Sequence, residues 1–150
     1  MAAPRNSGAT GPGGRAGTGR GVVSPVELAQ ACARIADEKK ADGILVLDIR
    51  GLSPVADYFV IATGRNRRQM QAISEAIVRE GKSMGNAPYG VEGVGEARWR
   101  LIDLGDVVVH IQTPDAREYY ALEILWGDAP RVDFQPGPAP PTSPGIFGSP

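Results

Sequence analysis

Two short, almost uninterrupted apolar segments constrain the fold of this chain more than any other feature. They are ILVLDI at residues 44–49 and DYFVIAT at residues 57–63. Apolar runs of this length, interrupted by glycine and proline, are typical of β-strands that are covered on both faces. Such strands need other elements packed against them, so the helical patterns elsewhere in the chain decide the fold class.

Helical patterns lie on either side of this strand pair. Ser24, followed by proline and then Glu27, has the sequence of a capping box, and Asn66 with Gln69 three residues later can begin a second helix. We expect the first helix to end near residues 42–43 and the second near residues 81–85. The residues that should face the core are Leu28, Cys32, Ile35, Ala29 and Ala36 in the first helix and Met70, Ile73, Ile77, Ala72 and Ala76 in the second.

The second half of the chain predicts a β-hairpin and a short helix. Residues 98–104 alternate in the manner of a strand, Gly105-Asp106 suits a two-residue turn, and residues 107–112 form the partner strand. Thr113, followed by proline, can cap a helix that docks through Tyr119, Leu122 and Trp126. Residues 86–97 contain several glycines and are expected to form a connection between the second helix and the hairpin.

The predicted order is helix, strand, strand, helix, strand, strand, helix. This order indicates an α/β fold, a small sandwich of two or three layers in which helices flank a mixed sheet. Residues 23–132 form the expected domain. Residues 1–22 are rich in glycine and lack acidic residues, and residues 133–150 are rich in proline. Both segments have too little apolar surface to fold alone, so we expect disordered tails.

The composition excludes several classes of function. The 150 residues include one cysteine and one histidine, and the formal net charge is −1. A single cysteine rules out an internal disulfide and a multi-cysteine zinc site. No apolar stretch approaches the roughly 20 residues that a membrane helix needs. We therefore expect a cytoplasmic protein with no membrane contact and no cofactor.

Catalytic residues are not evident in the sequence. Asp48, Asp57, Asp103 and Asp106 fall at strand ends, and the alternative function is therefore a nucleotidyltransferase-like enzyme that uses them. Two-metal chemistry needs closely spaced acids, and no Asp or Glu of the chain has another two residues away. We expect His110 to make a local hydrogen bond and Cys32 to be buried. The chain is accordingly predicted not to be an enzyme.

Recognition of a partner is the function that the sequence favours. Trp99 and Leu101, with Asp103, lie on one side of the predicted strand, and Arg98 and Arg100 lie on the other. Large aromatic residues next to arginine are typical of interface hot spots, and we expect Trp99 to contact a partner at a sheet edge. The alternative is a core tryptophan that faces the helix layer.

Three further arginines begin the second helix. Arg65, Arg67 and Arg68 oppose the helix dipole, which favours an anionic partner at this position. The alternative is a solvated basic turn. We include Arg67 and Arg68 among the expected partner-binding residues.

The chain resembles the ribosomal silencing factor family, whose members are also called iojap-like proteins. The residues that carry the resemblance are ADYFVIATG (56–64), VEG (91–93), RWRLIDLGDVVVHIQ (98–112), REYYALE (117–123) and LWGDAP (125–130). The resemblance covers about residues 24–132 and implies a nucleotidyltransferase-like fold without the catalytic acids. It assigns partner contact first to Trp99 and Leu101. Arg100 stands where many members have an aliphatic residue, and residues 65–69 are more basic than is usual.

The resemblance also implies a function and a partner. It implies a translation repressor that binds the large ribosomal subunit through its ribosomal protein number fourteen. Binding there would block joining of the small subunit and lower translation under nutrient limitation. The family resemblance further implies a homodimer when the protein is free. Arg98, Arg100 and the arginines at residues 65–68 would supply a polar rim and a minor contact with ribosomal RNA.

Overall fold

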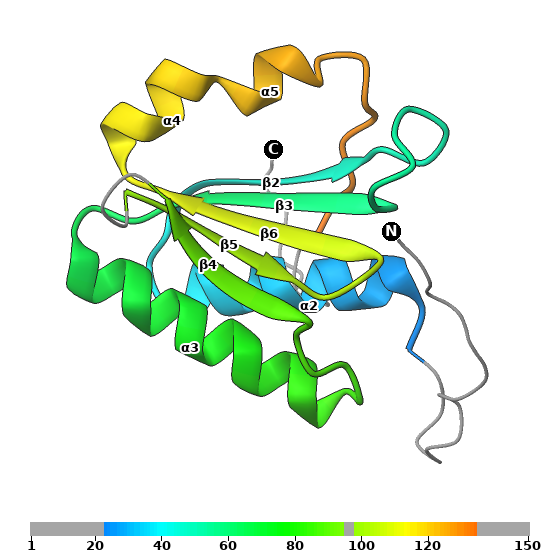
Figure 1. Cartoon of the computed structure of the whole chain (residues 1–150), viewed down its shortest axis with the longest axis horizontal. Coiled ribbons are helices and arrows are strands. Elements are labelled where there is room, and N and C mark those ends of the chain that lie inside the picture. The colour runs from blue at the N-terminus through cyan, green and yellow to red at the C-terminus, as the bar shows by residue number, and fades with distance from the viewer. Residues whose placement is uncertain (1–22, 95–97, 135–150) are drawn as a thin grey trace, which may run out of the picture.

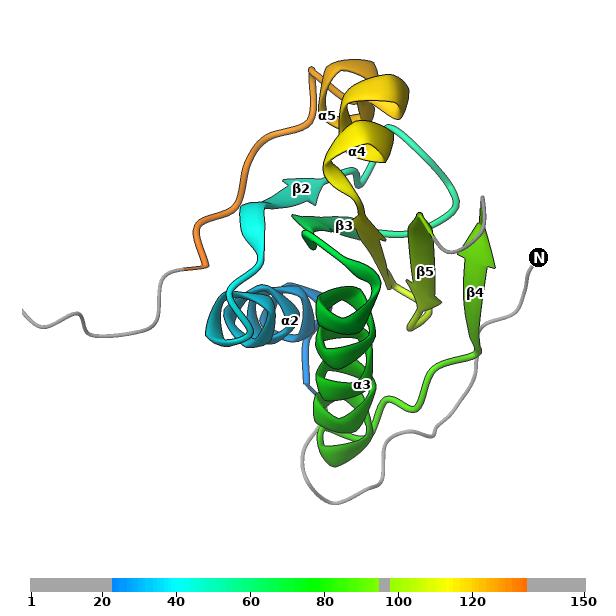
Figure 2. The same cartoon turned by 90° about the vertical axis from the view of Figure 1, so that its left-hand side faces the viewer.

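A five-stranded mixed sheet carries the fold, with two long helices on one face and two short helices on the other (Figures 1 and 2). The computed structural model describes residues 23–94 and 98–134. Its elements are α2 (Pro25–Glu38), β2 (Asp42–Asp48), β3 (Tyr58–Thr63), α3 (Arg67–Ser83), β4 (Gly90–Val94), β5 (Trp99–Asp103), β6 (Val107–Gln112), α4 (Pro114–Tyr120) and α5 (Leu122–Leu125). The predicted α/β class is confirmed.

The strand order across the sheet is β2-β3-β6-β5-β4. The central pair, β3 and β6, is parallel, and the other three pairs are antiparallel. Helix α3 and the strands β4 and β5 connect the two parallel strands. The predicted hairpin turn is confirmed, because the Leu104 N–H donates to the Val107 carbonyl oxygen at 2.9 Å and Gly105 has φ of 92°. Glycine adopts this positive φ at no steric cost, which explains its place in the turn.

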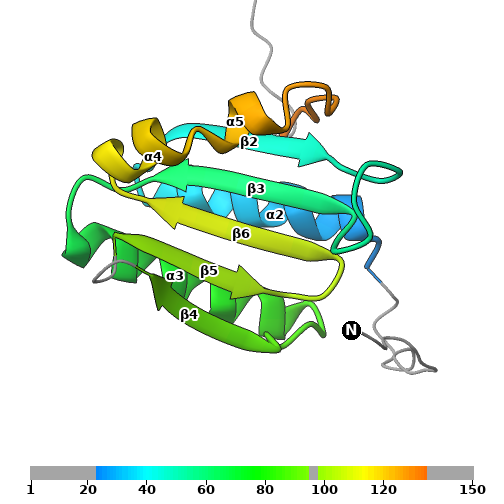
Figure 3. The ribbon, with the colours of Figure 1, turned by 45° about the horizontal axis from the view of Figure 1, so that its top comes forward.

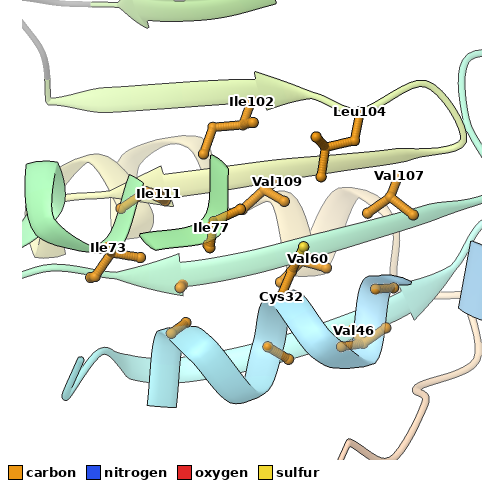
Figure 4. Close-up of a cluster of buried hydrophobic side chains, with 14 of the residues drawn as sticks. Cys32, Val46, Val60, Ile73, Ile77, Ile102, Leu104, Val107, Val109 and Ile111 are labelled. Carbon is orange, nitrogen blue, oxygen red and sulfur yellow. The ribbon is translucent and has the colours of Figure 1, made fainter. Parts of the chain in front are cut away.

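The larger core lies between the sheet and the helices α2 and α3. Figure 4 shows side chains from both helices and from the strands meeting there, with Cys32 of α2 beside Val60 of β3. Both predicted caps are confirmed: Ser24 and Glu27 form the reciprocal capping box, and Asn66 Oδ1 accepts from the Gln69 N–H at 2.8 Å. The expected stripes are buried except for Ile35, which is half-buried, and Ala72, which is exposed.

A second core covers the opposite face of the sheet. Its buried members come from β2, β3 and β6, from the loop between β2 and β3, and from the segment that follows β6: Leu47, Ile49, Ala56, Phe59, Ile61, Val108, Leu122 and Ala129. Trp99, Leu101 and Trp126 pack against it and are partly exposed. Figure 3 shows that α4 and α5 run above β2 and β3 and that β5 and β4 carry no helix on this face.

The prediction for residues 86–97 was wrong, because residues 90–94 form the strand β4. Each of its residues pairs with β5, from Gly90 opposite Asp103 to Val94 opposite Trp99. The glycines of this segment hide its strand character in the sequence, and pairing with β5 supplies it. Because β4 is the edge strand, β5 is an inner strand, and the prediction that Trp99 stands on an edge strand was also wrong.

The edge at β2 is covered by the end of the described chain. The Asp48 N–H donates to the Pro130 carbonyl oxygen at 2.9 Å, and the Val132 N–H donates to the Val46 carbonyl oxygen at 2.8 Å. Val132 and Phe134 also pack against the larger core. Residues 133–134 are thus docked, whereas the tail had been expected to begin at residue 133. The rest of the predicted tails, residues 1–22 and 135–150, lies outside the described residues.

Three predicted boundaries differ in detail. Helix α2 ends at Glu38, earlier than the predicted residues 42–43. Lys40, two residues later, has a positive φ of 70°, and β2 begins at Asp42. The last predicted helix is divided into α4 and α5, because Ala121 adopts the left-handed conformation with φ of 45°. This break changes the phase of the helix. Tyr119 therefore points to solvent instead of docking, while Leu122 is buried and Trp126 is half-buried.

Candidate partner-binding surface

Trp99 lies on the sheet face that α4 overhangs, and two contacts fix its ring. Its indole Nε1–H donates to Nδ1 of His110 on the neighbouring strand β6 at 3.1 Å. The ring of Tyr120, at the end of α4, lies 4.6 Å away between centroids. The indole is half-buried. The indole is therefore neither enclosed in the core nor fully exposed. His110 and Tyr120 contact part of it, and its exposed part can contact a partner.

His110 acts as the fixed acceptor beneath this indole. Its side chain is 5% exposed and packs edge-on against Phe59 at 4.7 Å between centroids. Burial lowers its pKa to about 4, because the charged imidazolium loses hydration. The ring is therefore neutral at pH 7, and since Nδ1 accepts the indole proton, the ring proton sits on Nε2. The expected local hydrogen bond of His110 is confirmed.

Arg117 fastens the helices α4 and α5 to the sheet. Its Nε–H donates to both carboxylate oxygens of Glu123, at 3.1 and 3.2 Å, and Nη1 donates to Oγ1 of Thr63 at 2.8 Å. The guanidinium also lies against Gly43, where a Cβ atom would come within 3.1 Å of Nη1. Thr113 Oγ1 caps α4 by accepting from the Ala116 N–H at 3.3 Å, as predicted.

The outer side of α4 and α5 exposes large apolar side chains. Tyr119 is 80% exposed, Tyr120 42%, Ile124 77% and Leu125 71%. The Tyr120 ring contacts both Tyr119 and Trp99, and we call these three residues, with Leu101, Ile124 and Leu125, the apolar face. Large exposed apolar patches on folded proteins mark interaction sites. Tyr120, Ile124 and Leu125 were not among the predicted site residues. The signal that could have identified them is the presence of large apolar residues on every side of a short helix.

The residues predicted to bind a partner do not form one site. Trp99 and Leu101 belong to the apolar face. Asp103 lies on the same face at the end of β5, where its Oδ1 accepts from the Gly105 N–H at 2.9 Å and supports the turn. The four arginines lie elsewhere. The sheet therefore separates the predicted set into an apolar part and a cationic part.

The arginines occupy the end and the opposite face of the sheet. Arg98 precedes β5 and forms an exposed ion pair with Asp115 at 3.1 Å. The pKa of Asp115 is lowered, first by the hydrogen bond from Thr113 and to a smaller extent by Arg98. Arg100 points to the α3 side, where it lines a hollow between α3 and the strands. Arg67 and Arg68 line a second hollow at the start of α3.

Two of the groups considered for catalysis, Asp48 and Cys32, are ion-paired and buried, respectively. Arg50 donates to both carboxylate oxygens of Asp48, at 2.9 and 2.7 Å, and these bonds lower the pKa of that carboxyl. Burial, helped by nearby Glu80, raises the pKa of the Cys32 thiol to about 12, and its expected burial is confirmed. Within residues 23–94 and 98–134, no group of three or more His, Cys, Asp or Glu side chains could hold a metal ion. None of the described helices has the length and apolar character needed to cross a membrane.

A family model, curated relatives and solved structures are similar to this chain. A family model described as "Ribosomal silencing factor during starvation" matches residues 23–145. The ribosomal silencing factor of Bacillus subtilis is 47% identical over 110 residues, covering 73% of this chain and 93% of that protein. The "Mitochondrial assembly of ribosomal large subunit protein 1" of Mus musculus is 33% identical over 92 residues, covering 59% and 40%. A crystal structure of a Chromobacterium violaceum protein gives a TM-score of 0.66 at 32% identity, covering 79% of this chain and 98% of that chain.

An exposed apolar face beside a mixed sheet is a feature of proteins that bind other macromolecules. The matches are more specific, because the family model covers most of the chain. The chain belongs to the ribosomal silencing factor family. Membership implies regulation of translation on the ribosome, so the family resemblance of the sequence is confirmed.

Proposed function

We propose that this protein binds the large ribosomal subunit through its ribosomal protein number fourteen and sterically blocks joining of the small subunit. The description of the family model refers to ribosomal silencing during starvation, and this supports lowered translation under nutrient limitation. The name of the mouse relative refers to the large subunit, which supports that choice of subunit. The protein would act in the cytoplasm by occupancy alone, without a cofactor or a chemical step, so repression would follow its concentration.

The apolar face is the observation that carries this proposal. Aromatic anchors in partly covered positions, surrounded by exposed aliphatic residues, are the usual composition of an interface centre. Trp99 meets that description because His110 and Tyr120 fix its ring before any partner arrives. A side chain that is already ordered loses less entropy on binding, which favours affinity. Arg98 and Asp103 lie near the ends of β5 and would form part of the polar rim.

Two further properties belong to the same proposal. The free protein would form a homodimer, because an exposed apolar surface of this kind is unfavourable in water and a second copy can cover it. Bound protein would also make a minor contact with ribosomal RNA through its arginines. Each property can be tested independently of the contact with ribosomal protein number fourteen.

Replacing Ile124 and Leu125 together by serine tests the apolar face. Both side chains are more than two-thirds exposed, so the double variant should fold normally. We expect it to bind purified large subunits about 10-fold more weakly, which corresponds to a loss of about 1.4 kcal/mol. Co-sedimentation over a concentration series measures the change.

A matched control removes exposed apolar residues elsewhere. Leu52 and Val55 lie in the loop between β2 and β3 and are 48% and 63% exposed. Their double serine variant should bind large subunits as tightly as the parent protein. Equal loss in both double variants would mean that general surface hydrophobicity, and not the apolar face, is responsible.

A further inference from the structure

The face of β5 opposite Trp99 borders a hollow whose lining is cationic. The hollow has a volume of about 420 Å³ and lies between α3 and the strands β4 and β5. Arg100 reaches into it from β5, and Arg79 and Lys82 reach into it from the second half of α3. Val78 and Val91 supply an apolar part of the wall. Figure 2 shows α3 running beside the outer strands along this side of the sheet.

Three basic residues and one acidic residue line this hollow. Within the part of the chain that the structure describes, Arg79, Lys82 and Arg100 form no ion pair. The one acidic residue of the lining is Glu75, which accepts a hydrogen bond from the Gln71 side chain at 3.0 Å. Like charges placed together raise the electrostatic energy of the folded protein unless an anion joins them.

A second hollow extends the cationic surface toward the start of α3. It has a volume of about 480 Å³ and is lined by Arg67 and Arg68, and it shares Gln71 and Glu75 with the first. The helical rise separates Arg68 from Lys82 by about 21 Å along the axis of α3. Basic residues thus lie along one side of α3, and with Arg100 of β5 they form what we call the cationic row: Arg67, Arg68, Arg79, Lys82 and Arg100.

We propose that the cationic row binds the phosphodiester backbone of RNA. The inference rests on the proposed function, which brings this protein to a particle built largely of RNA. Basic residues near both ends of α3 can contact separate phosphates of one strand, because arginine forks bind phosphate oxygens bidentately. An acidic peptide would offer the same sign of charge, and arginine clusters also bind acidic peptides. We favour RNA because the basic residues span about 21 Å of α3, a length that suits a strand of phosphates, and because the proposed partner particle is rich in RNA.

The proposed contact is local and independent of sequence. The chain as a whole has a formal net charge of −1, so no global field attracts nucleic acid. Only the α3 side presents the row, while the apolar face lies on the other side of the sheet. A protein partner on one face of the sheet and an RNA strand on the other would contact β5 and β4 from both sides. These two contacts would fix the orientation of the bound protein.

Salt-dependent binding to a defined RNA tests the row. The probe is a fluorescein-labelled RNA hairpin with a stem of about 12 base pairs, and fluorescence anisotropy measures its affinity for the full chain. Each neutralised phosphate contributes about −0.9 to the slope of log K against log salt concentration in duplex DNA. Replacing Arg79 and Lys82 together by glutamine should therefore reduce the steepness of the slope by about 2 and weaken binding at low salt at least 10-fold.

The control removes two positive charges outside the row. Arg34 and Lys39 belong to α2 and its C-cap, and neither lines the two hollows. The variant with glutamine at both positions should bind the hairpin as the parent does. An equal loss in both variants, or no binding by the parent protein at low salt, would overturn the proposal. Stronger binding of a poly-glutamate peptide than of the hairpin would overturn it in favour of an acidic protein partner.

The same variants separate this inference from the proposed function. The Arg79 and Lys82 double variant should bind isolated ribosomal protein number fourteen normally, since both residues lie away from the apolar face. The Ile124 and Leu125 double serine variant should bind the RNA hairpin normally. Loss of hairpin binding without loss of protein binding supports the row, whatever the outcome for the apolar face.

Discussion

Replacing Trp99 by alanine should weaken binding to ribosomal protein number fourteen by about 30-fold or more, a loss of at least about 2 kcal/mol. The expected effect is large because the half-buried ring is held by a hydrogen bond to His110 and by packing against Tyr120. A ring that is ordered before binding contributes its contact area with little further loss of entropy. Titration of the labelled ribosomal protein with each variant measures the change in Kd.

Truncation of Trp99 also affects stability, and a second variant separates the two effects. Alanine removes the packing against Tyr120 and leaves Nδ1 of His110 without its donor, so we expect the free energy of unfolding to fall by about 1–2 kcal/mol. Trp99→Phe loses the same hydrogen bond but keeps an aromatic ring at the surface. It should bind more tightly than Trp99→Ala. Circular dichroism and urea unfolding establish that both variants are folded. Unchanged affinity in a folded Trp99→Ala protein would remove the indole from the proposed interface.

Acidification should destabilise the protein through His110, by up to about 3 kcal/mol between pH 6.5 and pH 4. The folded pKa of about 4 lies below the ordinary value of 6.5. Between these two values the unfolded chain binds a proton that the folded chain excludes. The free energy of unfolding therefore falls as the pH is lowered through this window, and above pH 6.5 His110 contributes no pH dependence. Urea unfolding at a series of pH values measures the slope.

The variant His110→Gln isolates this effect. Glutamine does not titrate and still offers an oxygen to the Trp99 indole, so the variant should lose most of the pH dependence between pH 6.5 and pH 4.5. The carboxyls of Asp48 and Asp115 have pKa values lowered below 3.8, and their stabilising contributions are lost only at more acidic pH. Equal slopes for parent and variant would mean that His110 is not held neutral in the folded protein.

The elements predicted correctly are those that local chemistry determines. Ser24 and Thr113 precede prolines and cap helices, and Gly105 permits the positive φ of the hairpin turn. In each case a few neighbouring residues contain the whole signal. The strand β4 was missed because its glycines have low strand propensity, and its structure depends on pairing with β5. Such pairing is not visible in the segment itself.

The candidate site was predicted only in part, for a similar reason. Alternation along β5 correctly placed Trp99 and Leu101 on the face opposite Arg100. The contribution of Tyr120 was missed because the sequence predicted one helix that docks through Tyr119, Leu122 and Trp126, whereas Ala121 ends α4 in the left-handed conformation and separates Tyr119 from that stripe. An alanine gives no sequence signal for this conformation, which glycine or asparagine adopts more readily.

The position of β5 inside the sheet changes the expected mode of binding. An inner strand has its backbone groups paired on both sides, so Trp99 and Leu101 cannot present a free edge to a partner strand. The partner must instead meet their side chains, together with those of α4 and α5. We therefore expect affinity to respond to truncation of apolar side chains and not to changes in backbone pairing.

Subunit joining in a sucrose gradient tests the central claim most directly. Purified large subunits are incubated with an excess of this protein, small subunits are added, and the fractions are probed for the protein and for joined ribosomes. We expect the protein to migrate with free large subunits and the peak of joined ribosomes to shrink as its concentration rises, whereas Trp99→Ala leaves the joined peak largely intact. Full joining in the presence of large-subunit-bound protein, or protein that stays at the top of the gradient, would contradict the account.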